Sequence, residues 1–282
     1  MKSSTEHVGR GLWTAALIAA VACGGTDAST PKAECEDPPA VDAAEALELY
    51  LEGWSEAAPT ERACMFQRSL APDVVLIATA TPIPGRSAVV QELDERTTQL
   101  FGDSAMRDLA GSVESRHHEA RLPWTVADAS GAVVERGEDW LEFNDDGLLS
   151  RVHILAGTGA DAPLSDALLA WQRAWNARDE ADRADALSDA ATENVGFTDI
   201  VTEVHGREAL GIEIGRQQNA INATLRLDER VEVFAGGGDQ PILLRLSAQL
   251  RMPQGGAIHV VDYVRLRDGR IEQLSGFPSP AP

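Results

Sequence analysis

The sequence predicts an α+β protein that contains two copies of one domain. The chain has 282 residues and is 44% apolar, enough for two domains that each bury a core. Helical apolar spacing comes first in each half, and alternating apolar residues follow it. Residues of the first half recur in the second at a constant offset of 121. The matching positions are Trp54 and Trp175, Val74 and Val195, and Gly85-Arg86 and Gly206-Arg207. A period this long indicates duplicated domains, which we place at 41–157 and 163–279, joined by the short stretch Gly157–Pro163.

The elements of each copy follow in the same order. Asp42 and Glu45 form a capping box for the first helix, and Ala63–Leu70 predicts a second helix. A short strand, Val74–Thr79, precedes the Gly-Arg pair that begins a third helix, and four longer strands complete the copy. The second copy repeats these elements, with a second helix at Arg183–Ala191 and a strand at Val195–Val201. Helices followed by strands predict three N-terminal helices packed on one face of a mainly antiparallel sheet.

The N-terminal segment predicts export. Lys2 and Arg10 flank the start of an apolar stretch, Leu12–Ala22, that is too short to span a bilayer and suits a signal peptide. Small residues before Cys23 resemble the lipobox of bacterial lipoproteins, which implies that residues 1–22 are removed and Cys23 is lipidated. The alternative is an ordinary secretory signal cleaved nearby. Gly24 after the cysteine favours, by the same resemblance, the outer membrane facing the periplasm.

Residues 23–40 lack an apolar period and predict a flexible tether between the lipid and the first domain. Lipidation of Cys23 would leave Cys35 and Cys64 in an oxidising compartment, where they form either a disulfide or two free thiols.

Composition excludes several classes of function. The formal charge of −21 argues against nucleic acid and anionic lipid headgroups as partners, so the only membrane contact expected is through Cys23. The only lysines are Lys2 and Lys32, which excludes a Schiff-base or phosphate-loop lysine from both copies. Three cysteines cannot form a Cys₄ zinc site. The adjacent His117 and His118 would point to opposite faces of a strand. We therefore expect no cofactor and no metal.

The stretch Val260–Ile271, together with the order of helices and the Gly-Arg pair, resembles the nuclear transport factor 2-like superfamily, especially its SnoaL-like and ketosteroid-isomerase-like members. The resemblance covers both copies and implies cone-shaped domains, in which a curved sheet wraps a helix and leaves an apolar pocket. Members of this superfamily include isomerases, cyclases, dehydratases and non-catalytic binding modules, so the fold alone assigns no reaction.

Alternation places one carboxyl on the inward face of a strand in each copy. Asp262 shares a face with Val260 and Val264, and Asp139 shares one with Val133 and Leu141. Desolvation of such a carboxyl raises its pKa, and a neutral carboxyl can donate a hydrogen bond to an oxyanion. The resemblance implies this oxyanion role for Asp262. The alternative for both residues is a buried carboxyl bonded to an arginine or a backbone amide, and we favour that alternative for Asp139.

The resemblance implies a general base at Asp199, with a turn cap as the alternative role. Neither copy has the complete family set, because Ala78 replaces the base in the first copy and Trp171 replaces the helix tyrosine, Tyr50, in the second. The first copy therefore predicts a degenerate pocket.

Aromatic residues on the first helix of each copy predict core packing that also forms a pocket wall. These residues are Tyr50, Trp54, Trp171 and Trp175. Phe197 adds to the predicted pocket, and His205 is expected at its rim. His153 alternates outward with Arg151 and is expected to be structural or exposed, and Arg86 and Arg207 are expected in ion pairs.

The sequence thus predicts a lipid-anchored envelope protein whose second domain binds a small apolar molecule, with the two domains packed as an internal pseudo-dimer. One alternative is a cofactor-independent isomerase, cyclase or dehydratase that uses Asp199 as base and Asp262 as oxyanion donor. A second alternative is a protein-binding scaffold with filled cores.

Overall fold

The computed structural model describes Cys35 and residues 38–78, 81–102, 105–157, 159–237 and 240–279. The expected signal peptide, the lipidation site Cys23 and most of the expected tether lie outside the described residues. No helix in the described part of the chain has the length and apolar character needed to cross a bilayer.

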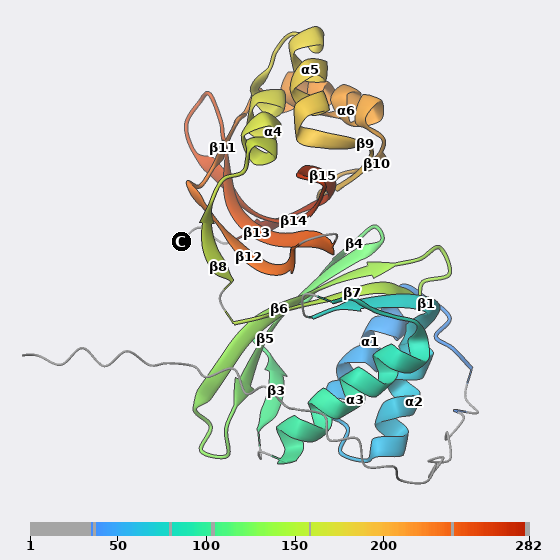
Figure 1. The fold of residues 1–282 in the computed structure, drawn as a ribbon. Helices are drawn as coiled ribbons and strands as arrows, with labels where there is room; N and C mark the ends of the chain where they lie inside the picture. The colour runs from blue at the N-terminus through green and yellow to red at the C-terminus, as the bar shows by residue number, and fades with distance from the viewer. Residues whose placement is uncertain are drawn as a thin grey trace, which may run out of the picture. The chain divides into compact units, whose positions relative to one another are not determined.

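The first domain begins with helices α1 (Ala43–Ser55) and α2 (Pro59–Ser69), strands β1 (Leu70–Ile77) and β2 (Ile83–Pro84), and helix α3 (Arg86–Gly102). The remaining strands are β3 (Met106–Leu109), β4 (Glu114–Arg116), β5 (Glu119–Ala127), β6 (Val133–Phe143) and β7 (Leu149–Ala156). The sheet has the order β2-β1-β7-β6-β5-β3, with β4 also paired to β5. Only β1 and β7 pair in parallel. The three helices cover one face of this sheet (Figure 1).

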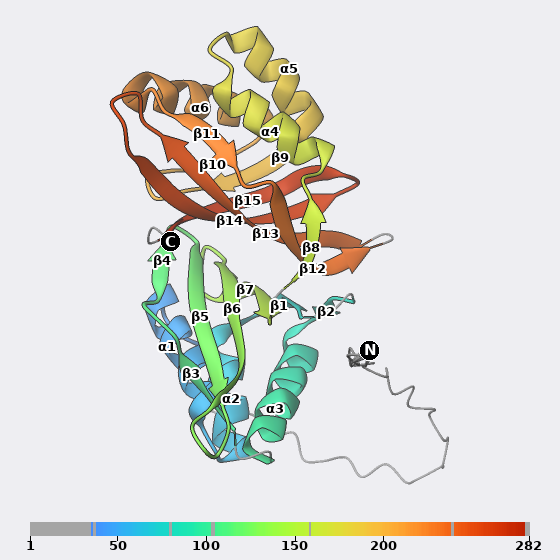
Figure 2. The ribbon, with the colours of Figure 1, turned by 90° about the vertical axis from the view of Figure 1, so that its left-hand side faces the viewer.

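The second domain repeats this plan with β8 (Ala160–Pro163), α4 (Asp166–Asn176), α5 (Glu180–Ala190), β9 (Ala191–Thr198), β10 (Glu203–His205) and α6 (Arg207–Ile221). Its last strands are β11 (Thr224–Leu227), β12 (Arg230–Gly237), β13 (Gln240–Arg251), β14 (Ala257–Arg267) and β15 (Arg270–Ser279). The sheet order is β10-β9-β15-β14-β13-β12-β8, and β11 pairs with β13. Figure 2 shows the long, curved strands β13, β14 and β15 beneath helices α4 and α6. The predicted α+β fold with two tandem domains is confirmed.

Local chemistry explains the helix ends. Asp42 caps α1 by accepting a hydrogen bond from the Glu45 amide, and Glu45 accepts one from the Val41 amide. Asp179 caps α5 in the same way. Gly206 precedes α6 with a φ of 89°, a conformation that favours glycine and explains the Gly-Arg pair at the start of the third helix.

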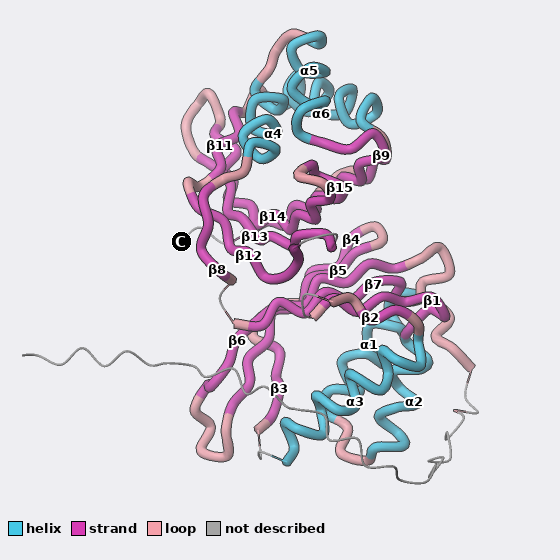
Figure 3. Tube along the Cα trace, in the orientation of Figure 1, coloured by secondary structure: helices cyan, strands magenta, loops and turns pink. Residues whose placement is uncertain are grey.

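The structure corrects the sequence prediction at three places. The expected linker contains strand β8, which pairs with β12 at the edge of the second sheet. The first of the four expected long strands is divided into β3 and β4 in one copy, and into β11 and β12 in the other (Figure 3). Strand β9 ends at Thr198 rather than at Val201, so Asp199 lies in a turn.

Each domain has its own apolar core between helices and sheet. A third apolar cluster contains side chains from the face of each sheet that is turned away from its helices. Its members are Ile77, Trp140, Leu155, Leu243, Tyr263 and Phe277. Ion pairs surround this cluster: Glu138 pairs with Arg121 and Arg245, and Glu142 pairs with Arg265. His153 points away from its own core, as alternation predicts, but it is fully buried against Trp140 and bonds Glu142.

Candidate functional site

The second domain contains a cavity of about 240 Å³ between α4, α6 and the sheet. Sixteen residues line it: Trp171, Trp175, Phe197, Asp199, Ile200, Val201, Gln217, Ile221, Leu225, Leu250, Ile258, Val260, Asp262, Leu274, Gly276 and Pro278. The set includes every pocket residue expected from the sequence except His205. His205 is exposed on β10 beside Glu203 and does not line this cavity.

Asp262 reaches the cavity because β14 alternates as predicted. Val264 and Leu266 lie in the core of this domain, whereas Tyr263 points to the third apolar cluster. The Asp262 side chain has no hydrogen-bond donor among the described residues, although the residue is only 5% exposed. Burial, with a smaller contribution from the charge of Asp199, raises the pKa of Asp262 to about 7. A substantial fraction of Asp262 is therefore neutral near pH 7 and able to donate a hydrogen bond.

Gly276 leaves room beside the Asp262 carboxyl because it has no side chain. It is the cross-strand partner of Asp262 on β15, and a Cβ added to Gly276 would lie 2.9 Å from Asp262 Oδ1. In the first domain the residue facing the equivalent carboxyl is Ile154. The glycine therefore keeps one side of Asp262 open.

Two indole N–H groups of the cavity wall also lack partners. Trp171 and Trp175 lie one turn apart on α4 with their ring centroids 5.9 Å apart, and the Nε1 atoms of both are buried without a hydrogen-bond acceptor. A buried donor without an acceptor costs free energy, so such donors are uncommon in protein interiors. Both Nε1 atoms are buried, so neither N–H group is open to the space of the cavity.

Asp199 lines the same cavity but is occupied by protein donors. Its Oδ1 accepts hydrogen bonds from the amides of Val201 and Thr202, and its Oδ2 accepts one of 2.6 Å from Gln217 Nε2. The residue therefore caps a turn, as the alternative interpretation of the sequence proposed, and also presents a carboxylate to the cavity. The two sequence-predicted carboxyls lie at one cavity in different surroundings.

The equivalent carboxyl of the first domain is fully satisfied. Asp139 is buried and accepts hydrogen bonds from Tyr50 Oη at 2.7 Å, from Trp124 Nε1 at 2.8 Å and from Arg107. This arrangement matches the structural role favoured for Asp139 from the sequence. Val133 does not share its inward face, because the register of β6 shifts near that residue and leaves Val133 half-exposed.

The strand registers show why the two carboxyls differ. Leu122 faces Asp139 and Leu246 faces Asp262, so the strands align residue by residue. On this alignment, none of the residues at the positions of the three Asp139 donors bonds Asp262. Tyr50, Arg107 and Trp124 are replaced by Trp171, Leu225 and Ala248.

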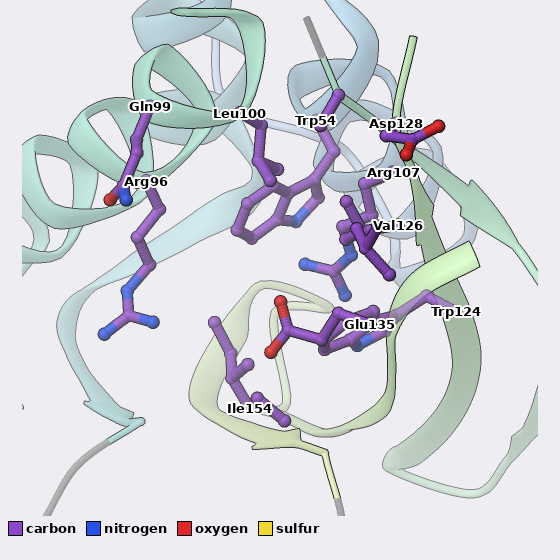
Figure 4. A pocket seen from close by; sticks show the side chains of 13 residues that line it. Trp54, Arg96, Gln99, Leu100, Arg107, Trp124, Val126, Asp128, Glu135 and Ile154 are labelled. Carbon is purple, nitrogen blue, oxygen red and sulfur yellow. The ribbon is translucent and has the colours of Figure 1, made fainter. Parts of the chain in front are cut away.

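Arg107 also lines a hollow of the first domain. Its guanidinium lies 4.0 Å from the ring centroid of Trp54 and 4.4 Å from that of Trp124, and Figure 4 shows it between the two indoles. The hollow of about 430 Å³ above this stack is lined partly by the charged side chains of Arg96 and Glu135, and Asp139 is not among its lining residues.

Sequence reasoning missed Arg107 and Trp124. The sequence feature that could have indicated Trp124 is Gly137. A Cβ at that position would collide with the Trp124 ring, and the second copy has Val260 at the equivalent position.

Cys35 and Cys64 form a disulfide with a Cα–Cα distance of 5.1 Å. His118 contacts Glu203, and neither it nor His117 lines the cavity.

No family model and no curated protein match this chain. Several solved structures are similar to part of it. A proposed isomerase of the SnoaL-like family from Agrobacterium tumefaciens is 17% identical, covers 39% of this chain and 93% of that protein, and gives a TM-score of 0.36. A proposed polyketide cyclase from Sinorhizobium meliloti is 22% identical, with coverages of 40% and 95% and a TM-score of 0.31. An NTF2-like protein of unknown function from Cytophaga hutchinsonii is 17% identical, with coverages of 41% and 88% and a TM-score of 0.30.

Proposed function

We propose that the second domain binds a small, mostly apolar molecule that places an oxygen acceptor against Asp262. The observation that carries this proposal is the buried Asp262 carboxyl, which faces a cavity and has no donor or acceptor partner among the described residues. A protein that needed this carboxyl only for stability would satisfy it, as the first domain satisfies Asp139. The oxygen of a bound carbonyl group would accept a hydrogen bond from the neutral Asp262 carboxyl.

The other features of the cavity fit the same kind of ligand. Its wall is almost entirely apolar, as expected of a site for a small apolar molecule. The described residues that line the cavity include no lysine, arginine or histidine. The site therefore favours a neutral ligand over an anionic one.

A second candidate is acid–base catalysis, and one observation favours it: Asp199 and Asp262 line the same cavity. Asp199 would remove a proton next to the ligand carbonyl, and neutral Asp262 would donate a hydrogen bond to the oxyanion that forms. This division of roles belongs to an isomerase, cyclase or dehydratase that needs no cofactor. Against it, the Asp199 carboxylate already accepts hydrogen bonds from three N–H groups of the protein, which hold it in its turn.

Binding is tested by calorimetry with 2-nonanone and the chain lacking residues 1–23, at pH 6 and pH 8.5. If only the neutral form of Asp262 binds, a pKa of about 7 weakens the affinity of the natural protein roughly 30-fold between these pH values. Asp262→Asn keeps a donor at every pH and should bind equally at both, whereas Asp262→Leu should lose binding. A natural protein that binds no ketone, or binds it equally at both pH values and in the Leu variant, would refute the proposal.

Catalysis is tested separately by the exchange of the ketone α-protons with deuterated water, followed by NMR. The natural protein should accelerate the exchange, and Asp199→Asn should remove the acceleration while 2-nonanone still binds. Binding without accelerated exchange would leave a binding protein and reject the enzyme.

We propose further that the protein is exported and anchored in the bacterial envelope through lipidated Cys23. The disulfide between Cys35 and Cys64 supports export, since disulfides persist in oxidising compartments. Radiolabelled palmitate should label the natural protein in cells, and Cys23→Ala should lose the label and leave the membrane fraction. Labelling that persists in Cys23→Ala would reject this anchor.

A further inference from the structure

Exposed apolar side chains form a rim at the cavity of the second domain. Ile200 and Val201 lie in the turn after β9, Ile221 ends α6, and Ile258 lies on β14. All four line the cavity, yet their exposed fractions range from 37% for Ile221 to 71% for Val201. Single exposed apolar residues are common on protein surfaces. Four that lie on three separate elements and continue the wall of one cavity form a connected apolar surface, which we call the rim.

The cavity is open at the rim and is small for a complete ligand site. Sites for small molecules usually measure roughly 300–1,000 Å³, whereas this cavity measures about 240 Å³. A ligand with its oxygen at Asp262 therefore fills the cavity with a short hydrocarbon segment, and any longer segment must leave across the rim. Apolar side chains at that exit would shield such a segment from water.

The charges around the site restrict the oxygen-bearing end. Among the lining residues that the structure describes, Asp199 and Asp262 alone are ionisable acids or bases, and both are acidic. A carboxylate at the inner end of a ligand would meet the Asp199 charge with no arginine or lysine in the lining to compensate for it. A ketone or an ester lacks this repulsion.

We propose that the ligand is a neutral, elongated molecule with its carbonyl end at Asp262 and a hydrocarbon tail that lies on Ile200, Val201, Ile221 and Ile258. This inference rests on the proposed binding function and adds the length and charge class of the ligand. Domain 1 does not offer the same surface, because charged Arg96, Asp128 and Glu135 line its hollow.

The test is a homologous series of ketones, 2-hexanone, 2-nonanone and 2-dodecanone, measured by calorimetry at pH 6 with the chain lacking residues 1–23. Each CH₂ group that becomes fully buried should tighten binding about fourfold, and a partly covered one about twofold. The affinity should therefore keep rising from 2-nonanone to 2-dodecanone. Dodecanoate should bind much more weakly than 2-dodecanone.

Two variants of the rim remain β-branched: Val201→Thr replaces a methyl group by a hydroxyl group, and Ile258→Thr replaces an ethyl group by a hydroxyl group. Each should weaken binding of 2-dodecanone several-fold, and weaken it more than binding of 2-hexanone, because only the longer ketone covers the rim. The matched control is Ile212→Thr, because Ile212 is 66% exposed on α6 and does not line the cavity.

The results separate this inference from the function on which it rests. If 2-hexanone binds but longer ketones gain nothing, or if the rim variants bind 2-dodecanone as the natural protein does, the tail is wrong and the binding function stands. Tight binding of dodecanoate would contradict the proposal that the end of the ligand at Asp262 is neutral. If no ketone of any length binds, the binding function fails, and this inference fails with it.

Discussion

Replacement of Asp262 by asparagine should stabilise this protein, and the gain should depend on pH. Burial, followed by the charge of Asp199, raises the pKa of Asp262 from 3.8 to about 7. Between these two pH values the folded chain binds more protons at this carboxyl than the unfolded chain does. The free energy of unfolding of the natural protein therefore falls as pH rises from about 4 to about 7, and stays low above that.

The size of the effect follows from the pKa difference. At about 1.4 kcal/mol for each pKa unit, the charged carboxyl costs about 4 kcal/mol at pH values well above 7. Part of this cost is already present at pH 5. The stability gap between Asp262→Asn and the natural protein should therefore widen by about 2–3 kcal/mol between pH 5 and pH 8.5.

The assay is urea denaturation of both proteins across this pH range, followed by tryptophan fluorescence. Asp139→Asn is the matched control with the opposite sign: it weakens the contact with Arg107 and should destabilise the protein at every pH. Parallel stability curves for Asp262→Asn and the natural protein would refute the reasoning, because they would mean that the carboxyl is hydrated or paired in the folded chain.

Three further predictions concern the neighbouring structure. Arg107→Met leaves the buried Asp139 without its cation and should reduce the free energy of unfolding by about 3–5 kcal/mol in urea; a loss below about 1 kcal/mol would contradict the ion pair. Burial, and then the charge of Glu142, raises the pKa of Glu119 to about 8, so the natural protein should lose stability relative to Glu119→Gln as pH rises from 5 to 9 in the same denaturation assay. A constant difference would show that Glu119 titrates normally. Gly276→Ala places a Cβ against Asp262 Oδ1 and should weaken calorimetric binding of 2-nonanone and cost about 1–3 kcal/mol of stability; unchanged binding would mean that the carboxyl does not use this space.

Much of the fold could be predicted because two periodicities were clear in the sequence. The alternation along β14 correctly separated Val264 in the core of the second domain from Tyr263 in the cluster between the sheets. The same alternation failed where strands end or bulge. The predicted alternation continued past Thr198 to Asp199, which lies in a turn. In β6 it continued past the register shift to Val133.

The partners of the buried carboxyls could not be predicted from alternation. Periodicity identifies the face on which a side chain lies, but the strand register decides which residues of other strands meet it. Arg107 reaches Asp139 from β3, which is not adjacent to β6 in the sheet. Exposure of His205 and burial of His153 likewise depend on packing between elements far apart in the sequence.

The contrast between the two copies supports a ligand more strongly than either copy alone. A duplicated domain starts with the same carboxyl in both copies, and a purely structural carboxyl would be bonded or replaced by an apolar residue in each. One copy has Tyr50, Trp124 and Arg107 around Asp139, so that both oxygens of this carboxyl accept hydrogen bonds. The other has Asp262, which has no hydrogen-bond partner among the described residues, at a cost in stability that an apolar side chain in the same place would remove. Retention of a costly carboxyl beside open space is expected where a bound molecule, rather than the protein, supplies the partner.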